Sequence, residues 1–466
     1  MVSMSTNLDT HERYHGLDGL RGFAMLLGIL LHGSLPYFSR MLEIESMWPA
    51  DDEQSLSLLL LFDFIHVWRM PTFFLLAGFF AHLLLERRTT KEFIVNRLKR
   101  IAVPLVIFGS IMALLLPVIW IYGWKGSISI ETMLSSFDKG LELDSSGGLV
   151  GHLWFLYYLI IIYIGLILFR FLAAFKRALV TISATWMGFV VLMAYINGLG
   201  PFPGVSLFMA FGLAIIGIIT AMSVTILALS ASTLSLVGRT SLGEWAAKLI
   251  YSRVPILLIS GAVILLTVRG VDESKPIWPL NMPDLFYFSI FFIYGYGLWS
   301  NKHLIEKLKS SATLVTLLIV SAAVYYAHLV SAGILEELRA SGKTEIISLF
   351  ETVNILAYGS AAVLITLGIV GVFEATIRGP VKWVRWLGDS SYWIYIIHLP
   401  LVAFLSFWVA HLDRDGWLRA LTGLNWTAEM KFTIVCLLTA ALGIITYRYL
   451  VRYTPIGWFL NGRRDG

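Results

Sequence analysis

Charged residues and cysteine are both scarce in this 466-residue chain. Charged side chains make up 14% of the sequence, whereas a soluble domain carries about 25%. Hydrophobic residues make up 58%, so the composition excludes an ordinary soluble protein and indicates a polytopic membrane protein. The single cysteine, Cys436, excludes an intramolecular disulfide and a cysteine-rich metal site. We therefore predict no metal site.

Several familiar catalytic motifs are also missing. The chain contains no GxSxG nucleophile elbow, no Walker phosphate loop and no HExxH zinc motif. The chain has a net charge of +5. In a membrane protein such a positive excess belongs to the cytoplasmic loops, so we expect no nucleic-acid partner. If the chain is an enzyme, a histidine is the best candidate for a general base, because its pKa lies near the operating pH.

Twelve apolar segments come close to the roughly 20 residues that a membrane-spanning helix needs. They predict an all-α, polytopic helical bundle with about 10–12 transmembrane helices, forming one domain over residues 1–466. Pro71 in the second segment predicts a break, with residues 55–68 at the interface or in a cavity and 71–85 crossing the membrane. The segments are 20–38, 58–85, 101–122, 150–170, 179–196, 205–229, 245–268, 285–301, 311–333, 347–373, 390–411 and 429–451.

Lysine and arginine are unevenly distributed over the connections between these segments. If the N-terminus is inside, the inner connections hold 22 of these residues and the outer ones hold 10. This asymmetry predicts that both termini are cytoplasmic, with residues 1–19 and 452–466 as tails. No small-residue cleavage site follows the first apolar run, so we expect it to remain as a transmembrane helix.

The first apolar segment carries Asp18, Arg21 and His32. Arg21 and His32 are eleven residues apart, so on a helix they share one face at a separation of roughly 16 Å. Asp18 lies three residues before Arg21, and Gly28 opens space between the two polar ends. Ionisable groups inside a membrane are costly, which favours a functional site. The structural alternative is an Arg21 that extends to the membrane surface and a His32 bonded to a backbone carbonyl.

A second polar cluster consists of Asp63, His66 and Arg69, which are spaced three residues apart. On a helix these side chains fall on one broad side, toward the outer end of the second segment. The cluster is typical both of a functional site and of a structural ion pair between Asp63 and Arg69.

The predicted inner loop that follows contains Arg97 and Arg100, three residues apart. Such charges usually reflect the positive-inside rule, although two arginines also suit phosphate oxygens. Further along, His152 and His398 stand alone in apolar segments, and Pro400 distorts the helix that carries His398. Each lone histidine is more often structural than catalytic. Three intramembrane histidines and two arginines in one chain nevertheless favour a shared polar cavity.

These motifs together resemble the integral-membrane acyltransferase family 3. The family carries an Arg, ten residues and a His in the first span, which here are Arg21 and His32, and an Arg-x-x-Arg in the loop after the second span, here Arg97 and Arg100. FFLLAGFF at 73–80 resembles the family's FFxxSGF phrase, with Ala77 in place of the usual serine. The C-terminal phrase G-x-x-SYxxYxxHxP is present as Gly388, Ser391, Tyr392, Tyr395, His398 and Pro400.

Within the family, DFIHVWRMPTFFLLAGFF and GHLWFLYYL look most like the glucan biosynthesis protein C subgroup, which succinylates periplasmic glucans. The resemblance is good over residues 14–110, 150–170 and 385–460 and poor over 175–280. It implies a multi-pass protein of the bacterial inner membrane that uses cytoplasmic acyl-CoA as co-substrate, with succinyl-CoA favoured over acetyl-CoA and no bound cofactor. It also implies a periplasmic glycan acceptor and a homo-oligomer or a glycan-synthesis complex as the setting.

The resemblance also implies roles for individual residues. His32 would act as general base, Arg21 would steer the donor and be held by Asp18, and Arg97 and Arg100 would bind the donor's phosphates. Arg69 could pair with the free carboxylate of a succinyl group. The acceptor side would be lined by Asp63, His66, Arg69, His152, Trp154 and His398.

Two other classes of protein remain open at this point. A transporter or flippase for a glycan or a lipid-linked sugar would also need many spans and intramembrane charges, although the two halves show no clear duplication. A structural or sensor membrane protein would need neither Arg21 with His32 nor Arg97 with Arg100. Binding or turnover of acyl-CoA separates the enzyme from both.

Overall fold

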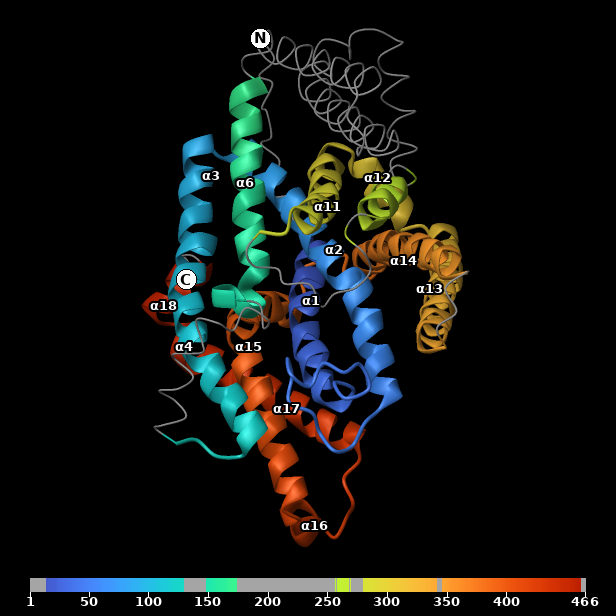
Figure 1. The fold of residues 1–466 in the computed structure, drawn as a ribbon. Helices are drawn as coiled ribbons and strands as arrows, with labels where there is room; N and C mark the ends of the chain where they lie inside the picture. The colour runs from blue at the N-terminus through green and yellow to red at the C-terminus, as the bar shows by residue number, and fades with distance from the viewer. Residues whose placement is uncertain are drawn as a thin grey trace, which may run out of the picture. The chain divides into compact units, whose positions relative to one another are not determined.

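The computed structural model describes residues 14–129, 148–173, 256, 258–267, 269, 280–341 and 346–461. All regular secondary structure in these ranges is helical (Figure 1), which confirms the all-α prediction. Eight helices are long and apolar enough to cross a membrane. The chain divides into two compact units, residues 1–160 with 256–466 and residues 161–255. The site described below lies in the first unit, and the single domain over residues 1–466 stays a prediction.

Nine of the twelve predicted spans coincide with long helices. Segment 285–301 corresponds to α11, which is not among the eight helices that meet the criteria for a span. Segments 179–196 and 205–229 lie outside the described residues, and of 245–268 only the last part is described. The α-helices are α1 (His15–Ser34), α2 (Leu56–Arg87), α3 (Thr90–Arg97), α4 (Val103–Lys125), α6 (Trp154–Ala173), α11 (Met282–Ser300), α12 (Lys302–Leu308), α13 (Ser311–Ala340), α14 (Ile347–Thr376), α15 (Lys382–Arg414), α16 (Trp417–Thr422), α17 (Ala428–Thr446) and α18 (Pro455–Asn461).

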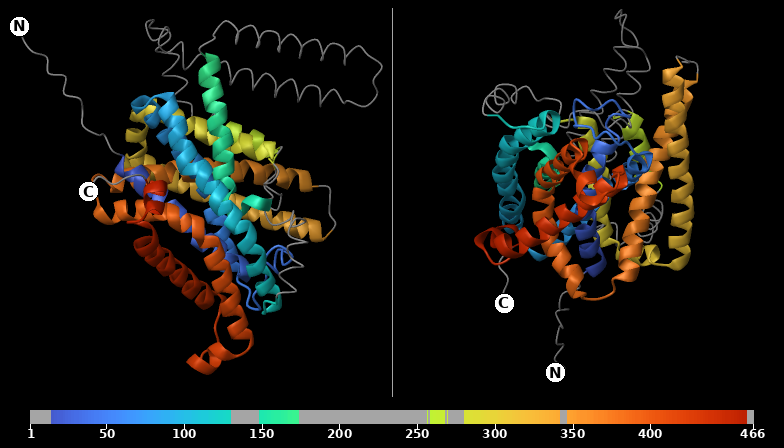
Figure 2. Two further views of the ribbon diagram at one scale, coloured as in Figure 1. Left: turned by 90° about the vertical axis from the view of Figure 1, so that its left-hand side faces the viewer. Right: turned by 90° about the horizontal axis from the view of Figure 1, so that it is seen from below.

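Helix α1 packs against both α15 and α2, which places its polar face between the two helices that carry most of the other candidate residues (Figure 1). Helix α2 packs in turn on α11, where Gly78 and Gly295 let the backbones meet. A Cβ built on Gly78 would lie 1.9 Å from the Phe292 carbonyl oxygen, so only glycine permits this approach. Helices α13 and α14 lie side by side (Figure 2). On α13, Leu318 and Ile319 are more than 60% exposed, as expected for a helix that faces lipid.

The predicted break at Pro71 is wrong, because α2 continues through this residue as one helix of 32 residues. Proline removes the backbone N–H that would bond the Val67 carbonyl, and its ring crowds the preceding turn, which contains Trp68. The Thr72 hydroxyl donates to the Trp68 carbonyl at 2.9 Å, and the Thr366 hydroxyl from α14 donates to the same oxygen at 3.4 Å. Side-chain hydroxyls of this kind allow proline inside a membrane helix, so residues 56–87 form a single element.

A loop of residues 38–55 joins the end of α1 to α2 and is tied to α15 and α17. Lys431 of α17 is 1% exposed and lies between two carboxylates, at 2.6 Å from Asp51 Oδ1 and 2.7 Å from Asp413 Oδ2. At the end of the loop, the Ser55 hydroxyl donates to Glu429 at 2.5 Å. These contacts hold the loop in place, and Trp48 within it is buried next to the C-terminal end of α1.

Candidate active site

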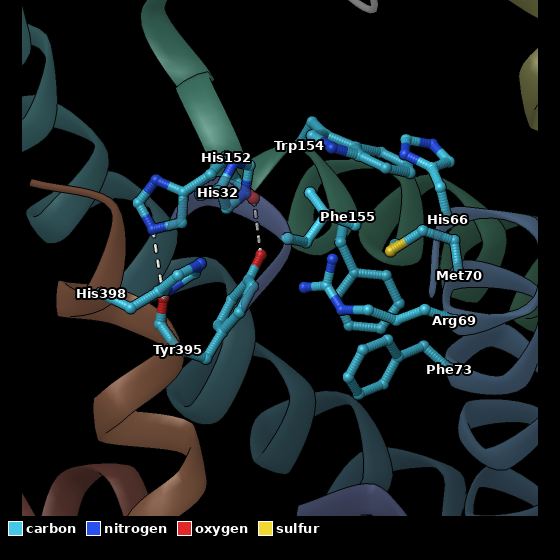
Figure 3. Close-up of a pocket in the computed structure, with 11 residues that line it drawn as sticks. His32, His66, Arg69, Met70, Phe73, His152, Trp154, Phe155, Tyr395 and His398 are labelled. Atoms are coloured by element: carbon cyan, nitrogen blue, oxygen red, sulfur yellow. Dashed lines mark hydrogen bonds between the residues drawn. The ribbon is translucent and has the colours of Figure 1, made fainter. Parts of the chain in front are cut away.

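A polar cavity lies among α1, α2, α15 and the start of α6 (Figure 3). Its volume is about 60 Å³, enough for a few groups the size of a water molecule. The lining combines five histidine or arginine side chains of the predicted set with tyrosine, tryptophan and apolar residues. It consists of Leu31, His32, His66, Arg69, Met70, Phe73, His152, Trp154, Phe155, Tyr395 and His398.

Three histidines from separate elements meet at this cavity. His32 comes from α1, His152 from the turn before α6 and His398 from α15. The ring centroids of His32 and His398 are 5.2 Å apart, and those of His152 and His398 are 5.0 Å apart. The structure thus brings together the histidines that the sequence predicted would share a cavity.

Backbone carbonyls fix the protonated nitrogen on two of these rings. The Nε2 atom of His152 lies 3.1 Å from the carbonyl oxygens of both Tyr395 and Ile396. Because a carbonyl only accepts, this Nε2 carries the proton. Pro400 has no N–H for the Ile396 carbonyl, so His152 occupies the acceptor that the proline leaves open. The Tyr395 hydroxyl completes the link by donating to the His152 carbonyl at 2.9 Å.

His398 is held in the opposite tautomer. Its Nδ1 lies 2.6 Å from the Tyr395 carbonyl and therefore donates to it. The Nε2 atom is left with a lone pair and is buried without a hydrogen-bond partner in the described part of the chain, as is Nδ1 of His152. Both rings consequently present a proton-accepting nitrogen inside the protein, which is the form that acid–base chemistry needs.

His32 is positioned by aromatic contact rather than by a carbonyl. Its ring is stacked on Trp48 with a centroid distance of 6.1 Å and an interplanar angle of 12°. Its Nδ1 is buried and has no hydrogen-bond partner among the residues that the structure describes. The alternative prediction for His32 was a hydrogen bond to a backbone carbonyl. Its Nδ1 forms no such bond to the described residues.

Arg69 places a guanidinium in the same cavity. The side chain is 6% exposed, its Nε donates to the Ala24 carbonyl at 3.1 Å, and its Cζ lies 5.6 Å from the centre of the Phe73 ring. Within the described ranges it forms no salt bridge, and the predicted structural pair with Asp63 is not formed. A Cβ built on Gly28 would lie 2.8 Å from His398 Nε2 and 2.9 Å from Arg69 Nη2. Gly28 thus leaves room for both, at a position where the sequence predicted open space between Arg21 and His32.

Asp63 lies outside the cavity lining, although we predicted it on the acceptor side. Its Oδ1 is 3.3 Å from His328 Nε2, and its Oδ2 accepts from the Tyr325 hydroxyl at 2.8 Å. His328 Nδ1 lies 2.6 Å from Asn354 Oδ1. These partners come from α13 and α14, which no local motif around Asp63 indicates. Asp63 faces these helices because it is six residues from Arg69, which places the two side chains on different parts of α2.

Arg21 and Asp18 lie near the N-terminal end of α1, away from the cavity. Arg21 Nη2 is 3.5 Å from Asp18 Oδ1, in agreement with the predicted charge-assisted contact, and Arg21 Cζ lies 5.5 Å from the centre of the Phe80 ring. Both side chains are partly exposed.

Arg21 belongs to a group of arginines that includes the predicted phosphate-binding pair. Arg100 is within electrostatic range of Arg97, Arg88 and Arg21, and we call these four residues the basic cluster. Arg100 lies in a π-helical segment, Leu98–Ala102, between α3 and α4. Such segments occur frequently at functional sites. The Tyr392 hydroxyl of α15 donates to the Arg100 carbonyl at 2.7 Å, which ties this segment to the helix that carries His398.

The sequence reasoning missed part of the lining. The C-terminal motif contains Tyr395 but does not indicate that this residue lines the cavity. Leu31, Met70, Phe73 and Phe155 carry no distinguishing signal in the sequence, because apolar and aromatic residues are common throughout these helices. Trp48 was missed because its contact with His32 depends on how the loop folds. No group of three potential metal ligands with suitable geometry occurs in the described ranges.

Comparison with known proteins gives matches of two kinds. A family model described as an acyltransferase domain matches residues 14–243 and 246–448. Glucans biosynthesis protein C of Escherichia coli strain SMS-3-5 / SECEC is 37% identical over 151 residues, which cover 32% of this chain and 37% of that protein. The protein of the same name from Escherichia coli strain K12 is 36% identical over the same shares. The chain therefore aligns with little more than a third of the length of these relatives. No solved structure matches.

Proposed function

The chain belongs to the integral-membrane acyltransferase family 3, and from this premise we propose that it moves an acyl group from cytoplasmic acyl-CoA to hydroxyl groups of a periplasmic or cell-surface glycan. An osmoregulated periplasmic glucan is the proposed acceptor, and succinyl is favoured over acetyl. The names of the similar proteins support a glucan. The bacterial inner membrane is the proposed location, with the termini in the cytoplasm.

One observation carries the proposal. The polar face of α1 joins two sites of complementary chemistry, with the basic cluster around Arg21 at one end and the histidine cavity around His32 at the other. Cationic fork-shaped side chains suit the phosphates of a CoA donor, and neutral histidines suit the removal of a proton from a hydroxyl. An acyltransferase that works across a membrane needs both, separated along one helix.

In the proposed reaction, Arg97, Arg100 and Arg21 hold the donor's phosphates, and the thioester extends along α1 toward His32. His32 then accepts the proton of the acceptor hydroxyl as it attacks the thioester carbonyl. General-base catalysis of this kind contributes typically about 10²–10⁴-fold to the rate. We assign this role to His32 because no carbonyl occupies its Nδ1 and because it lies on the face that leads from the basic cluster.

The test compares His32→Ala with His303→Ala in purified protein in lipid nanodiscs. His303 is exposed and lies in α12, away from the cavity, so His303→Ala serves as the matched control. We expect His32→Ala to retain acyl-CoA binding and lose acylation of the glucan, measured by mass spectrometry, while His303→Ala keeps both. An active His32→Ala protein refutes His32 as the base. Wild-type protein that moves a glycan without consuming acyl-CoA refutes the acyltransferase reaction itself.

A further inference from the structure

Arg69 is a buried cation next to groups that do not balance its charge. The side chain is 6% exposed and, among the described residues, lies within ion-pair distance of no carboxylate. Nε2 of His398, which shares the space beside Gly28 with Arg69 Nη2, offers no negative charge. Burying a charge without a counter-ion is costly, so the arrangement suits an anionic oxygen that is present only during the reaction.

We propose that Arg69 binds the negative oxygen of the tetrahedral intermediate, acting as the oxyanion-stabilising residue. This inference rests on the proposed acyl transfer and adds a residue to it. In the first step, the acceptor oxygen bonds to the thioester carbonyl carbon, its proton passes to His32, and the carbonyl π electrons move onto the carbonyl oxygen next to Arg69. In the second step, the C=O bond re-forms, the C–S bond breaks, and the CoA thiolate takes the proton from His32.

The position of the guanidinium is fixed before any substrate binds. The bond from Nε to the Ala24 carbonyl and the contact with the Phe73 ring hold the stem, and Figure 3 shows the terminal nitrogens pointing toward Tyr395 and the histidines. A charge that needs no reorganisation during the reaction stabilises a transition state more than one that must move. The hydrogen bond to the Ala24 carbonyl uses only the Nε of Arg69. The two terminal nitrogens of the guanidinium therefore remain for a substrate.

The neighbours of Arg69 distinguish this role from recognition of a succinyl carboxylate. Arg69 Nη2 and His398 Nε2 both lie within 3 Å of the position that a Cβ on Gly28 would occupy. Gly28 is about one helical turn before His32 on α1. An oxygen bound by Arg69 therefore lies among the proton-accepting histidines, where the carbonyl that reacts has to be. A receptor for the far end of a succinyl group would lie away from the group that takes the proton.

The experiment measures kcat and KM with succinyl-CoA and with butyryl-CoA, a donor of the same chain length that lacks the terminal carboxylate. For Arg69→Gln we expect kcat to fall by about 10²–10³-fold with both donors, with little change in KM. Arg69→Lys keeps the charge but not the fork-shaped guanidinium. Its kcat is therefore expected to fall less than that of Arg69→Gln, and by an equal factor with succinyl-CoA and with butyryl-CoA. Arg339→Gln is the control, because Arg339 is exposed at the end of α13.

Acyl-CoA binding and the melting temperature of each variant show whether it is folded. If Arg69→Gln does not fold, Arg69→Lys supplies the same comparison between donors. A loss confined to succinyl-CoA, a gain of activity with butyryl-CoA, or a wild-type kcat in either variant overturns the oxyanion role. None of these results affects the proposed function, which fails only if the wild type does not acylate a glycan with any acyl-CoA.

Discussion

Replacing Gly28 by alanine places a methyl group where His398 and Arg69 meet. The built Cβ lies 2.8 Å from His398 Nε2 and 2.9 Å from Arg69 Nη2, whereas comfortable heavy-atom contacts lie at about 3.5–4.0 Å. Relieving both contacts requires the two side chains to move by up to roughly 1 Å. A displacement of that size at reacting groups costs on the order of 10²-fold in rate. We therefore expect the kcat of Gly28→Ala to fall about 100-fold.

The effect on stability is expected to be much smaller. Alanine in place of glycine inside a helix gains about 1 kcal/mol, and overpacking costs about 1–3 kcal/mol, so the net loss is about 0–2 kcal/mol. Acyl-CoA binding is expected to stay intact, because the basic cluster lies about two turns away along α1. Acylation assays, donor-binding measurements and thermal unfolding of the purified protein together separate these effects.

Gly333→Ala supplies the control for this prediction. Gly333 lies in α13, and a Cβ built there meets nothing within 4 Å. The same chemical change is therefore expected to raise stability by about 0.5–1 kcal/mol and to leave kcat unchanged. If Gly28→Ala keeps the kcat of the wild type, then His398 Nε2 and Arg69 Nη2 do not need their observed positions, and the active-site reasoning is refuted.

Two further predictions concern contacts around the site. Tyr392→Phe removes the hydrogen bond to the Arg100 carbonyl, which is worth about 1 kcal/mol. The KM for acyl-CoA is therefore expected to rise about 5-fold with kcat unchanged. Steady-state kinetics test this, and a change confined to kcat would contradict it. Lys431→Met leaves the buried carboxylate of Asp51 and the partly buried carboxylate of Asp413 without their cation, so stability is expected to fall by about 3–5 kcal/mol. Thermal unfolding measures the loss, and an unchanged melting temperature would show that the loop is held by other contacts.

The fold was largely predictable because membrane helices leave a strong local signal. Long apolar runs located nine helices, and the spacing of Arg21 and His32 predicted a shared face of α1. The error at Pro71 has a physical cause that no local rule contains. Pro71 lacks the N–H that would bond the Val67 carbonyl, and the next carbonyl in this turn, that of Trp68, accepts from Thr72 and from Thr366, which is almost three hundred residues away in the chain.

The histidines of the site were predictable and their states were not. Ionisable residues in apolar segments stand out because placing them in a membrane costs free energy. His32, His152 and His398 could be grouped on this ground alone. Which nitrogen of the His152 and His398 rings carries the proton depends on backbone carbonyls of α15. For the same reason Asp63 was grouped with Arg69 by spacing, although its partners lie on α13 and α14.

The small volume of the cavity has an electrical consequence. Many cell membranes hold a voltage, and a water-filled passage between two polar ends of a protein would discharge it. Here about 60 Å³ lies among tightly packed aromatic and imidazole rings, with Trp48 stacked over His32. In the proposed reaction an acyl group would cross this point while attached to one molecule and then the other, so the transfer itself would need no continuous water-filled passage.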